Sequence, residues 1–186
     1  MTERKMKSES LEWIMSFLIA IIAGLVIKFF LFTPIVVDGQ SMKSTLNDQD
    51  RMIVSKLSKP ERFDIVVFHA NEKQDYIKRV IGLPGDKIEY ENDTLYINGK
   101  AYEEEYLEEN KKWIKEQFGE DALLTDNFTL EDLWGYETVP EDTIFVLGDN
   151  RRFSKDSRHI GVIPMKAIIG DAKIVIWPIK NAQIIR

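Results

Sequence analysis

The chain has 186 residues, 44% of them hydrophobic and 30% charged, and this composition indicates a folded protein with one substantial domain. The formal net charge of −6 argues against a nucleic-acid partner, because phosphate binding needs a clustered basic surface. The absence of cysteine excludes thiol nucleophiles, disulfides and thiolate metal sites. With only His69 and His159 present, we expect neither a histidine-based catalytic triad nor a multi-histidine zinc site.

The first distinctive segment runs from Trp13 to Phe32 and is apolar except for Ser16 and Lys28. As a helix, these 20 residues would span roughly 30 Å, the thickness of the hydrocarbon core of a bilayer. Pro34 then disfavours further helix, so we predict a membrane anchor over residues 13–33. A cleaved secretory signal would need a small-x-small site, which is missing here, and a buried core helix would be unusually apolar around its whole circumference.

The orientation of this anchor follows from the charges that flank it. Arg4, Lys5 and Lys7 precede the segment, and the excess of positive charge on cytoplasmic flanks predicts that residues 1–12 form a cytoplasmic tail. Residues 34–186 should then form an extracytoplasmic catalytic domain, which makes the protein a single-pass protein of the cell membrane.

Most of the remaining chain has the character of β-strands. Short β-branched segments separated by turn residues predict strands at 35–37, 51–54, 64–68, 76–81, 87–90, 94–97, 143–147 and 172–177. Residues 102–136 are acidic and include one amphipathic helical pattern, so we interpret them as a charged, cap-like insertion. The predicted fold is mainly β: an N-terminal transmembrane helix, then an antiparallel sheet domain with a small α-containing insertion.

Ser41 and Lys78 are candidates for a nucleophile and its base. Ser41 follows Gly39 directly after the apolar segment, and this glycine allows a sharp turn that exposes the hydroxyl. The serine amide is a candidate donor to an oxyanion. A lysine can accept the serine proton only when it is neutral, and burial among apolar residues can lower its pKa by several units. Lys78 lies in an apolar strand, and Arg79 should point to the opposite face.

A third polar cluster follows the predicted strand at 143–147. The run from Gly148 to Gly161 is costly to fold unless its groups satisfy one another. Asp156 and Arg158 are suited to a bidentate ion pair, and Ser154 could orient a neighbouring amine.

Together the three motifs resemble those of the type I signal peptidases, membrane-anchored serine proteases with a Ser–Lys dyad. The motifs are Ser-Met-x-x-Thr-Leu from Ser41, Lys-Arg-Val-Ile-Gly-Leu-Pro-Gly-Asp from Lys78, and Gly-Asp-Asn-Arg…Ser-x-Asp-Ser-Arg-x-x-Gly from Gly148. The resemblance extends from the anchor to Trp177 and is strongest to the compact Gram-positive type.

The resemblance implies a role for each matching residue. Ser41 corresponds to the acylated nucleophile and Lys78 to its general base. The supporting positions are Ser154, which would position Lys78, the ion pair of Asp156 and Arg158, and the further candidates Asp149 and Arg79. Two positions depart from the family: Ser44 stands where proline is usual, and Gly39 replaces the oxyanion serine of Gram-negative members, which leaves the second oxyanion donor open.

The implied activity is removal of signal peptides from exported preproteins, without metal or organic cofactor. The partners would be preproteins and the lipid bilayer, with no nucleic acid. The cleavage segment should bind in an extended form near Asp38, Gly39 and Gln40 and the strand preceding Lys78, with small residues at the first and third positions before the cut. Two alternatives stay open: a catalytically silent, membrane-tethered binder of signal sequences, and a Ser–Lys protease of the self-cleaving repressor kind, which would carry DNA-binding segments instead of an anchor.

Overall fold

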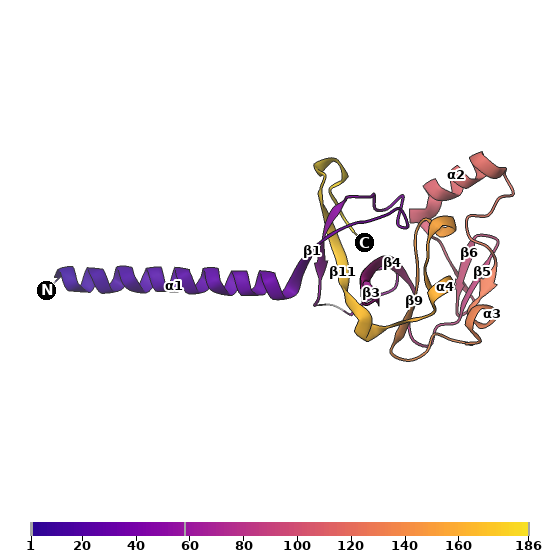
Figure 1. The fold of residues 1–186 in the computed structure, drawn as a ribbon. Helices are drawn as coiled ribbons and strands as arrows, with labels where there is room; N and C mark the ends of the chain where they lie inside the picture. The colour runs from indigo at the N-terminus through magenta and orange to yellow at the C-terminus, as the bar shows by residue number, and fades with distance from the viewer. Residues whose placement is uncertain (1, 58, 186) are drawn as a thin grey trace.

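The computed structural model describes residues 2–57 and 59–185, except for the side chains of residues 2–11 and 26–30. Helix α1 (Thr2–Leu31) extends away from the rest of the chain as a single rod, and all strands lie beyond its C-terminal end (Figure 1). The part of the chain that the structure describes contains no helix with both the length and the hydropathy of a membrane span. Lys28 and the basic residues used to predict the orientation lie outside the described side chains.

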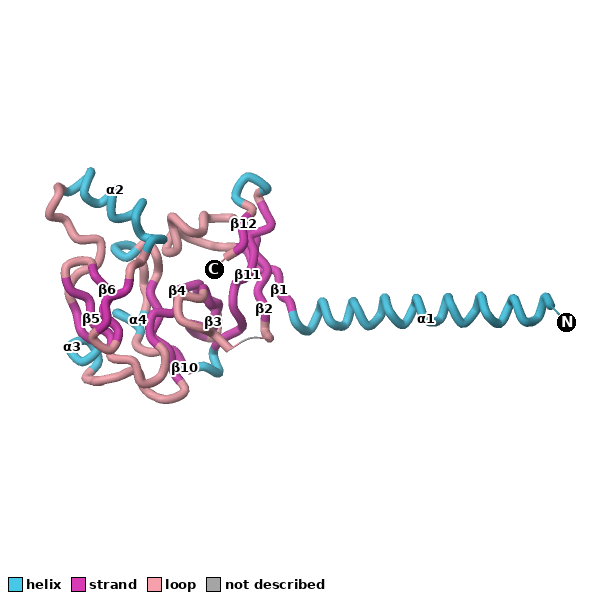
Figure 2. Tube along the Cα trace, turned by 180° about the vertical axis from the view of Figure 1, so that it is seen from behind, coloured by secondary structure: helices cyan, strands magenta, loops and turns pink. Residues whose placement is uncertain are grey.

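The larger sheet is antiparallel throughout. Its strands are β1 (Phe32–Val36), β2 (Arg51–Ser55), β3 (Ile65–Asn71), β4 (Gln74–Gly82), β9 (Thr143–Leu147), β10 (Ile163–Pro164), β11 (Ile168–Trp177) and β12 (Gln183–Ile184). The order is β1-β2-β11-β3-β4-β9-β10, with β12 paired to β11. Residues from both ends of the domain therefore meet in the centre of one sheet, as Figure 2 shows for β2, β11 and β3.

The smaller sheet has the order β7-β6-β5-β8. Its strands are β5 (Ile88–Glu91), β6 (Thr94–Ile97), β7 (Lys100–Tyr102) and β8 (Phe128–Thr129). Asn92 and Asp93 connect β5 to β6, and both have positive φ, as a tight two-residue hairpin requires. Asn98 and Gly99 do the same between β6 and β7.

Short helices decorate the two sheets. They are the α-helices α2 (Glu108–Phe118), α3 (Leu130–Trp134) and α4 (Ser157–Ile160), and the 3₁₀ turns η1 (Glu105–Leu107), η2 (Arg151–Phe153), η3 (Met165–Ala167) and η4 (Ile179–Asn181). Helix α3 begins after Thr129, whose hydroxyl accepts from the Asp132 amide, and ends at Gly135, which has a left-handed φ of 71°.

A continuous apolar core joins the two sheets. Ile81, Phe145 and Leu147 of the larger sheet pack in one cluster with Ile88 and Leu95 of the smaller sheet. Because this contact is apolar and fully buried, it holds the two sheets together through the hydrophobic effect. Helix α2 is anchored separately, mainly through Leu107 before it and Ile114 within it.

The antiparallel, mainly β architecture predicted from the sequence is confirmed, with strands at every predicted position. The N-terminal helix differs in its bounds from the predicted anchor at 13–33. It begins at Thr2 and ends at Leu31, because Phe32–Val36 pair with β2 as a strand, and Thr33 and Pro34 lie within that strand. Residues 102–136 contain η1, α2, β8 and α3, so this segment also contributes a strand to the smaller sheet.

Candidate active site

Ser41 and Lys78 meet at the centre of the candidate site. Ser41 lies in the turn that follows β1, and Lys78 lies in the middle of β4. The Nζ of Lys78 is 2.7 Å from the Oγ of Ser41 and donates a second hydrogen bond to the carbonyl of Ile77 at 2.9 Å. The serine hydroxyl is thus within direct proton-transfer distance of an amine.

Burial changes the acidity of this amine. The side chain of Lys78 is buried, since only 3% of the residue is exposed. Loss of hydration disfavours the ammonium form and lowers the pKa of Lys78 from 10.5 to about 8, although the charges of Asp156 and Asp149 oppose this effect. About one lysine in ten would be neutral at pH 7, compared with roughly one in a few thousand for an exposed lysine.

The turn that carries Ser41 is held from two sides. Gly39 has a left-handed φ of 94°, and its amide donates to Asp48 Oδ1 at 2.8 Å. Asn150, from the loop after β9, donates its backbone amide to the carbonyl of Ser41 and its side-chain amide to the carbonyl of Gln40, both at 3.0 Å. The position of the serine therefore depends on the loop that begins at Gly148.

Arg79 and Asp149 form a fully buried ion pair. The guanidinium Nε and Nη2 of Arg79 donate to the two carboxylate oxygens of Asp149 at 2.9 and 2.7 Å. Thr45 donates to the same carboxylate at 2.5 Å. Because consecutive residues of a strand point to opposite faces, this ion pair lies on the face of β4 away from the Lys78 side chain, yet it connects β4, the serine turn and the loop after β9.

Asp156 and Arg158 also form a bidentate pair, with both hydrogen bonds at 2.9 Å. The carboxylate also accepts from the Gly148 amide at 3.0 Å and from the backbone amide of Arg158 at 3.3 Å. Burial alone would raise the pKa of Asp156, but the hydrogen bonds and charge of Arg158, together with the Gly148 amide, hold it below its ordinary value. The pair therefore stays ionised and fixes the start of the polar loop, the segment from Gly148 to Gly161.

Ser154 behaves differently from expectation. Its hydroxyl is buried and does not form the expected hydrogen bond to Lys78; it lies beside the Asp156 carboxylate and helps to lower the pKa of that group. The amine instead donates to Ser41 and to its own strand. The Ser154 side chain is packed against Gly148: a Cβ added to that glycine would lie 2.2 Å from the serine Oγ.

A groove of about 360 Å³ opens beside the Ser41–Lys78 pair. One wall is the segment 35–42, which includes Asp38, Gly39 and Gln40, and the other is the segment 75–78 of β4. In the described structure, β9 pairs with β4 only at Arg79, Val80 and Gly82, so the first half of β4 has one edge without a partner strand. This edge faces the groove.

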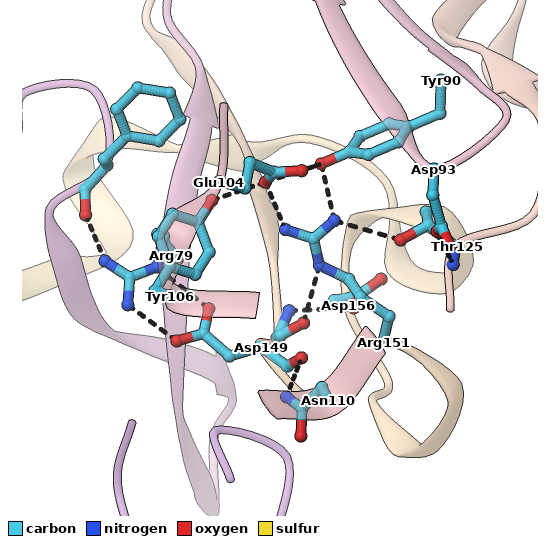
Figure 3. A network of polar contacts seen from close by, with 12 residues as sticks. Arg79, Tyr90, Asp93, Glu104, Tyr106, Asn110, Thr125, Asp149, Arg151 and Asp156 are labelled. Atoms are coloured by element: carbon cyan, nitrogen blue, oxygen red, sulfur yellow. Dashed lines mark hydrogen bonds and ion pairs between the residues drawn. The ribbon is translucent and has the colours of Figure 1, made fainter. Parts of the chain in front are cut away.

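Sequence reasoning missed Asn110 and the buried network beside the site. One side-chain nitrogen of Asn110, on helix α2, donates to the carbonyls of Lys43 and Asp149, both at 2.9 Å. Figure 3 shows Asn110 below Asp149, and beyond it a buried network in which Arg151 bonds Glu104 and Tyr90. These contacts could not be predicted because they join residues far apart in the sequence, and the sequence around Asn110 does not indicate which groups its side chain contacts.

Neither histidine contributes to this site. His69 is exposed on β3 and bonds Asp75 Oδ1 at 2.6 Å. His159 lies on α4 and borders a different cavity. No group of three or more potential metal-ligating side chains is found within the described residues.

Comparison with known proteins agrees with this geometry. The family described as "Signal peptidase, peptidase S26" matches residues 10–177. Signal peptidase I of Bacillus caldolyticus is 46% identical over 185 residues, with 97% of each chain covered. Signal peptidase IB of Staphylococcus aureus is 42% identical over 181 residues, covering 93% of this chain and 92% of that protein. A crystal structure of a signal peptidase I from Enterococcus faecalis matches with a TM-score of 0.57 and 43% identity, over 62% of this chain and 98% of that one.

The mainly β fold and the match to a peptidase family define the class of this protein as a serine peptidase. The chain belongs to the signal peptidase family, the S26 peptidases, and acts as a signal peptidase I that removes signal peptides.

Proposed function

We propose that Ser41 is the nucleophile and Lys78 the general base with which this signal peptidase cleaves preproteins. The observation that carries this proposal is the 2.7 Å contact between a buried amine of lowered pKa and a serine hydroxyl at the edge of a groove. Neutral Lys78 takes the proton as Ser41 Oγ attacks the scissile carbonyl. The ammonium then protonates the leaving amine, and the acyl-enzyme is hydrolysed by water that the same lysine deprotonates. The Ser41 amide is our candidate donor to the oxyanion.

The substrate binds in an extended form along the groove. The free edge at residues 75–78 offers backbone groups to which a peptide can add as a further strand. Asp38, Gly39 and Gln40 line the opposite wall, so the peptide would lie between the two segments. We propose that small residues occupy the first and third positions before the cut, as in an Ala-x-Ala site.

The buried residues around the pair act as supports. The ion pairs Arg79–Asp149 and Asp156–Arg158 hold the strand and the polar loop on which the serine turn rests. Because Arg79, Asp149 and Asp156 are buried, removing the partner of any of them would leave an uncompensated charge and disturb the site. For Ser154 we propose a packing role beside Gly148 in this state of the enzyme.

We further propose that residues 13–33 anchor the enzyme in the lipid bilayer, with residues 1–12 in the cytoplasm and residues 34–186 outside. Two observations support this. The apolar side chains of α1 from Trp13 to Leu25 are exposed on a helix that leaves the domain (Figure 1). The groove begins at Ile35, only four residues after the helix ends, so the near end of the groove would lie within about 13 Å of the end of the helix.

The part of the larger sheet formed by β1, β11 and β12, with the η4 turn, also exposes apolar side chains. Its exposed side chains are Phe32, Val36, Ile174, Ile176, Trp177, Ile179 and Ile184. Exposed apolar patches of this kind mark contact surfaces, and this one would rest on the membrane. Anchoring would raise the rate of encounter with signal peptides that are themselves embedded in the bilayer.

The test is incubation of the detergent-solubilised full chain with a preprotein that carries an Ala-x-Ala site. Wild-type protein should release the mature protein, whereas Ser41→Ala and Lys78→Ala should not. Lys73→Ala, in the exposed turn before β4, and Ser55→Ala, on β2, are the matched controls and should keep their activity. Processing that survives in Ser41→Ala or Lys78→Ala would refute the dyad, whereas a wild-type protein that binds the preprotein without cleaving it would support the alternative of a catalytically silent binder.

A further inference from the structure

A second cavity of about 420 Å³ lies beside the candidate active site. Its walls come from the serine turn, helix α2 and the polar loop, and they include Gln40, Lys43, Glu109, Asn110, Trp113 and Phe153. The proposed reaction as described above does not use this cavity. Its volume suits a few side chains of a peptide and is far too small for a folded domain.

The second cavity adjoins the groove at the nucleophile. Gln40 and Phe153 line both hollows, and Gln40 directly precedes Ser41. On the proposed function, the groove holds the residues before the scissile bond. A peptide chain that continues past the serine away from the groove therefore reaches the second cavity with the residues that follow the cut.

The surface of the cavity is suited to an apolar side chain. Trp113 is 47% exposed and Phe153 is 64% exposed, although both are large aromatic residues. Aromatic rings left open to water at the rim of a site gain free energy when a ligand covers them. Lys43 and Glu109 place one positive and one negative charge in the cavity wall. The substrate residue next to the apolar one can therefore be selected by its charge.

The floor of the cavity is rigid. Asn110 donates to the carbonyls of Lys43 and Asp149 and thereby joins helix α2 to the serine turn and to the loop after β9. The nearby Asn150 side chain holds the carbonyl of Gln40 at 3.0 Å. A preformed, rigid pocket loses little entropy when it binds a flexible chain, and this favours its use for recognition.

We infer that this cavity binds the first residues of the mature protein, immediately after the cleavage site, and prefers an apolar or aromatic side chain there. The inference rests on the proposed function and assigns to helix α2 of the acidic insertion a part in substrate selection. The acidic insertion at residues 102–136 would then contact the substrate and would not be only a charged surface segment.

The experiment compares preproteins that are identical except for the two residues after the cut. We would measure kcat/KM for wild type and Trp113→Ala, since Trp113 lines only the second cavity, whereas Phe153 also lines the groove. Wild type should cleave the substrate with Phe or Leu after the cut about 10-fold faster than the one with Ala. In Trp113→Ala this ratio should fall to near one, while the preference for Ala over larger residues before the cut should not change. Tyr136→Ala removes another exposed aromatic side chain, 43% exposed after α3 and lining neither hollow, and should leave both ratios as in wild type.

A charge-reversal pair makes the test independent of the tryptophan. Glu109 and Glu116 both lie on α2, but only Glu109 lines the cavity. Glu109→Lys should lower kcat/KM for a substrate with Lys after the cut relative to one with Glu, and Glu116→Lys should not. The inference is overturned if wild type does not discriminate among residues after the cut, or if Trp113→Ala slows every substrate by the same factor. If wild type cleaves no substrate at all, the proposed function itself fails.

Discussion

The Nζ of Lys78 and the Oγ of Ser41 lie 2.7 Å apart, although 36 residues separate them in the chain. The amine reaches the hydroxyl from a strand, and the hydroxyl comes from a turn that the loop after β9 holds in place. The position of Lys78 therefore depends on strand β4, whereas the position of Ser41 depends on its turn and on the loop after β9. Its pKa and its position can be tested separately.

The pH dependence of cleavage should report the pKa of Lys78. Burial lowers this pKa to about 8, and only the neutral amine can accept the serine proton. We expect kcat/KM to rise about 10-fold per pH unit below pH 8 and to level off above it. A rise in kcat/KM with its midpoint near pH 10 would contradict the assignment. So would a midpoint near pH 8 that shifted in the surface control Lys73→Ala.

Lys78→Met should stabilise the protein while it abolishes activity. A lysine whose pKa is lowered in the folded state destabilises that state at every pH below about 8, and the penalty disappears as pH rises towards the unfolded value of 10.5. Methionine fills a similar volume without a charge, so the free energy of unfolding at pH 7 should increase by up to about 3 kcal/mol. Urea denaturation at several pH values checks this. The gain should shrink between pH 8 and 10.5, and a gain that grew over that range would be the wrong sign.

Gly148→Ala should damage the site directly. The added methyl group would lie 2.5 Å from the Ser41 carbonyl oxygen and 2.2 Å from Ser154 Oγ, so either the serine turn or the polar loop must move. We expect the variant to lose at least 100-fold in kcat, because small displacements of reacting groups have large effects on rate.

Gly170→Ala is the matched control for that substitution. Its added methyl would lie 2.2 Å from the Ser55 carbonyl oxygen, so it should also lower the melting temperature, but its nearest neighbours are Ser55 and Val54 of β2 and not the serine turn. The folded fraction of Gly170→Ala should keep its kcat. Equal loss of kcat in the two variants would mean that stability alone, and not the position of Ser41, explains the effect.

Asn110→Ala should lower activity although the residue lies outside the sequence motifs. It removes two hydrogen bonds, each with a net contribution of roughly 1 kcal/mol, that hold the carbonyls of Lys43 and Asp149. We expect kcat to fall about 10-fold, and further in Asn110→Asp, since a carboxylate would face two carbonyl oxygens. Asn127→Ala serves as the control: this residue accepts a hydrogen bond from the Asn92 amide in the smaller sheet, and its loss should change stability alone.

Local features of the sequence determined the elements of this protein. The turn pairs Asn92-Asp93 and Asn98-Gly99 are typical of hairpins because such residues tolerate positive φ, and the structure has positive φ at all four. Alternation along a strand predicted that Lys78 and Arg79 leave opposite faces, and the close spacing of Asp156 and Arg158 predicted their ion pair. The order of the three motifs was enough to indicate the family.

Only the tertiary structure decided what these elements do together. The division of the strands into two sheets, the contacts of Asn110 and the approach of Lys78 to Ser41 all depend on which distant segments become neighbours. Propensity and periodicity act within a few residues, whereas strand order and burial are properties of the whole chain. The lowered pKa of Lys78 is of this second kind, since it arises from the surroundings that the folded domain builds around the amine.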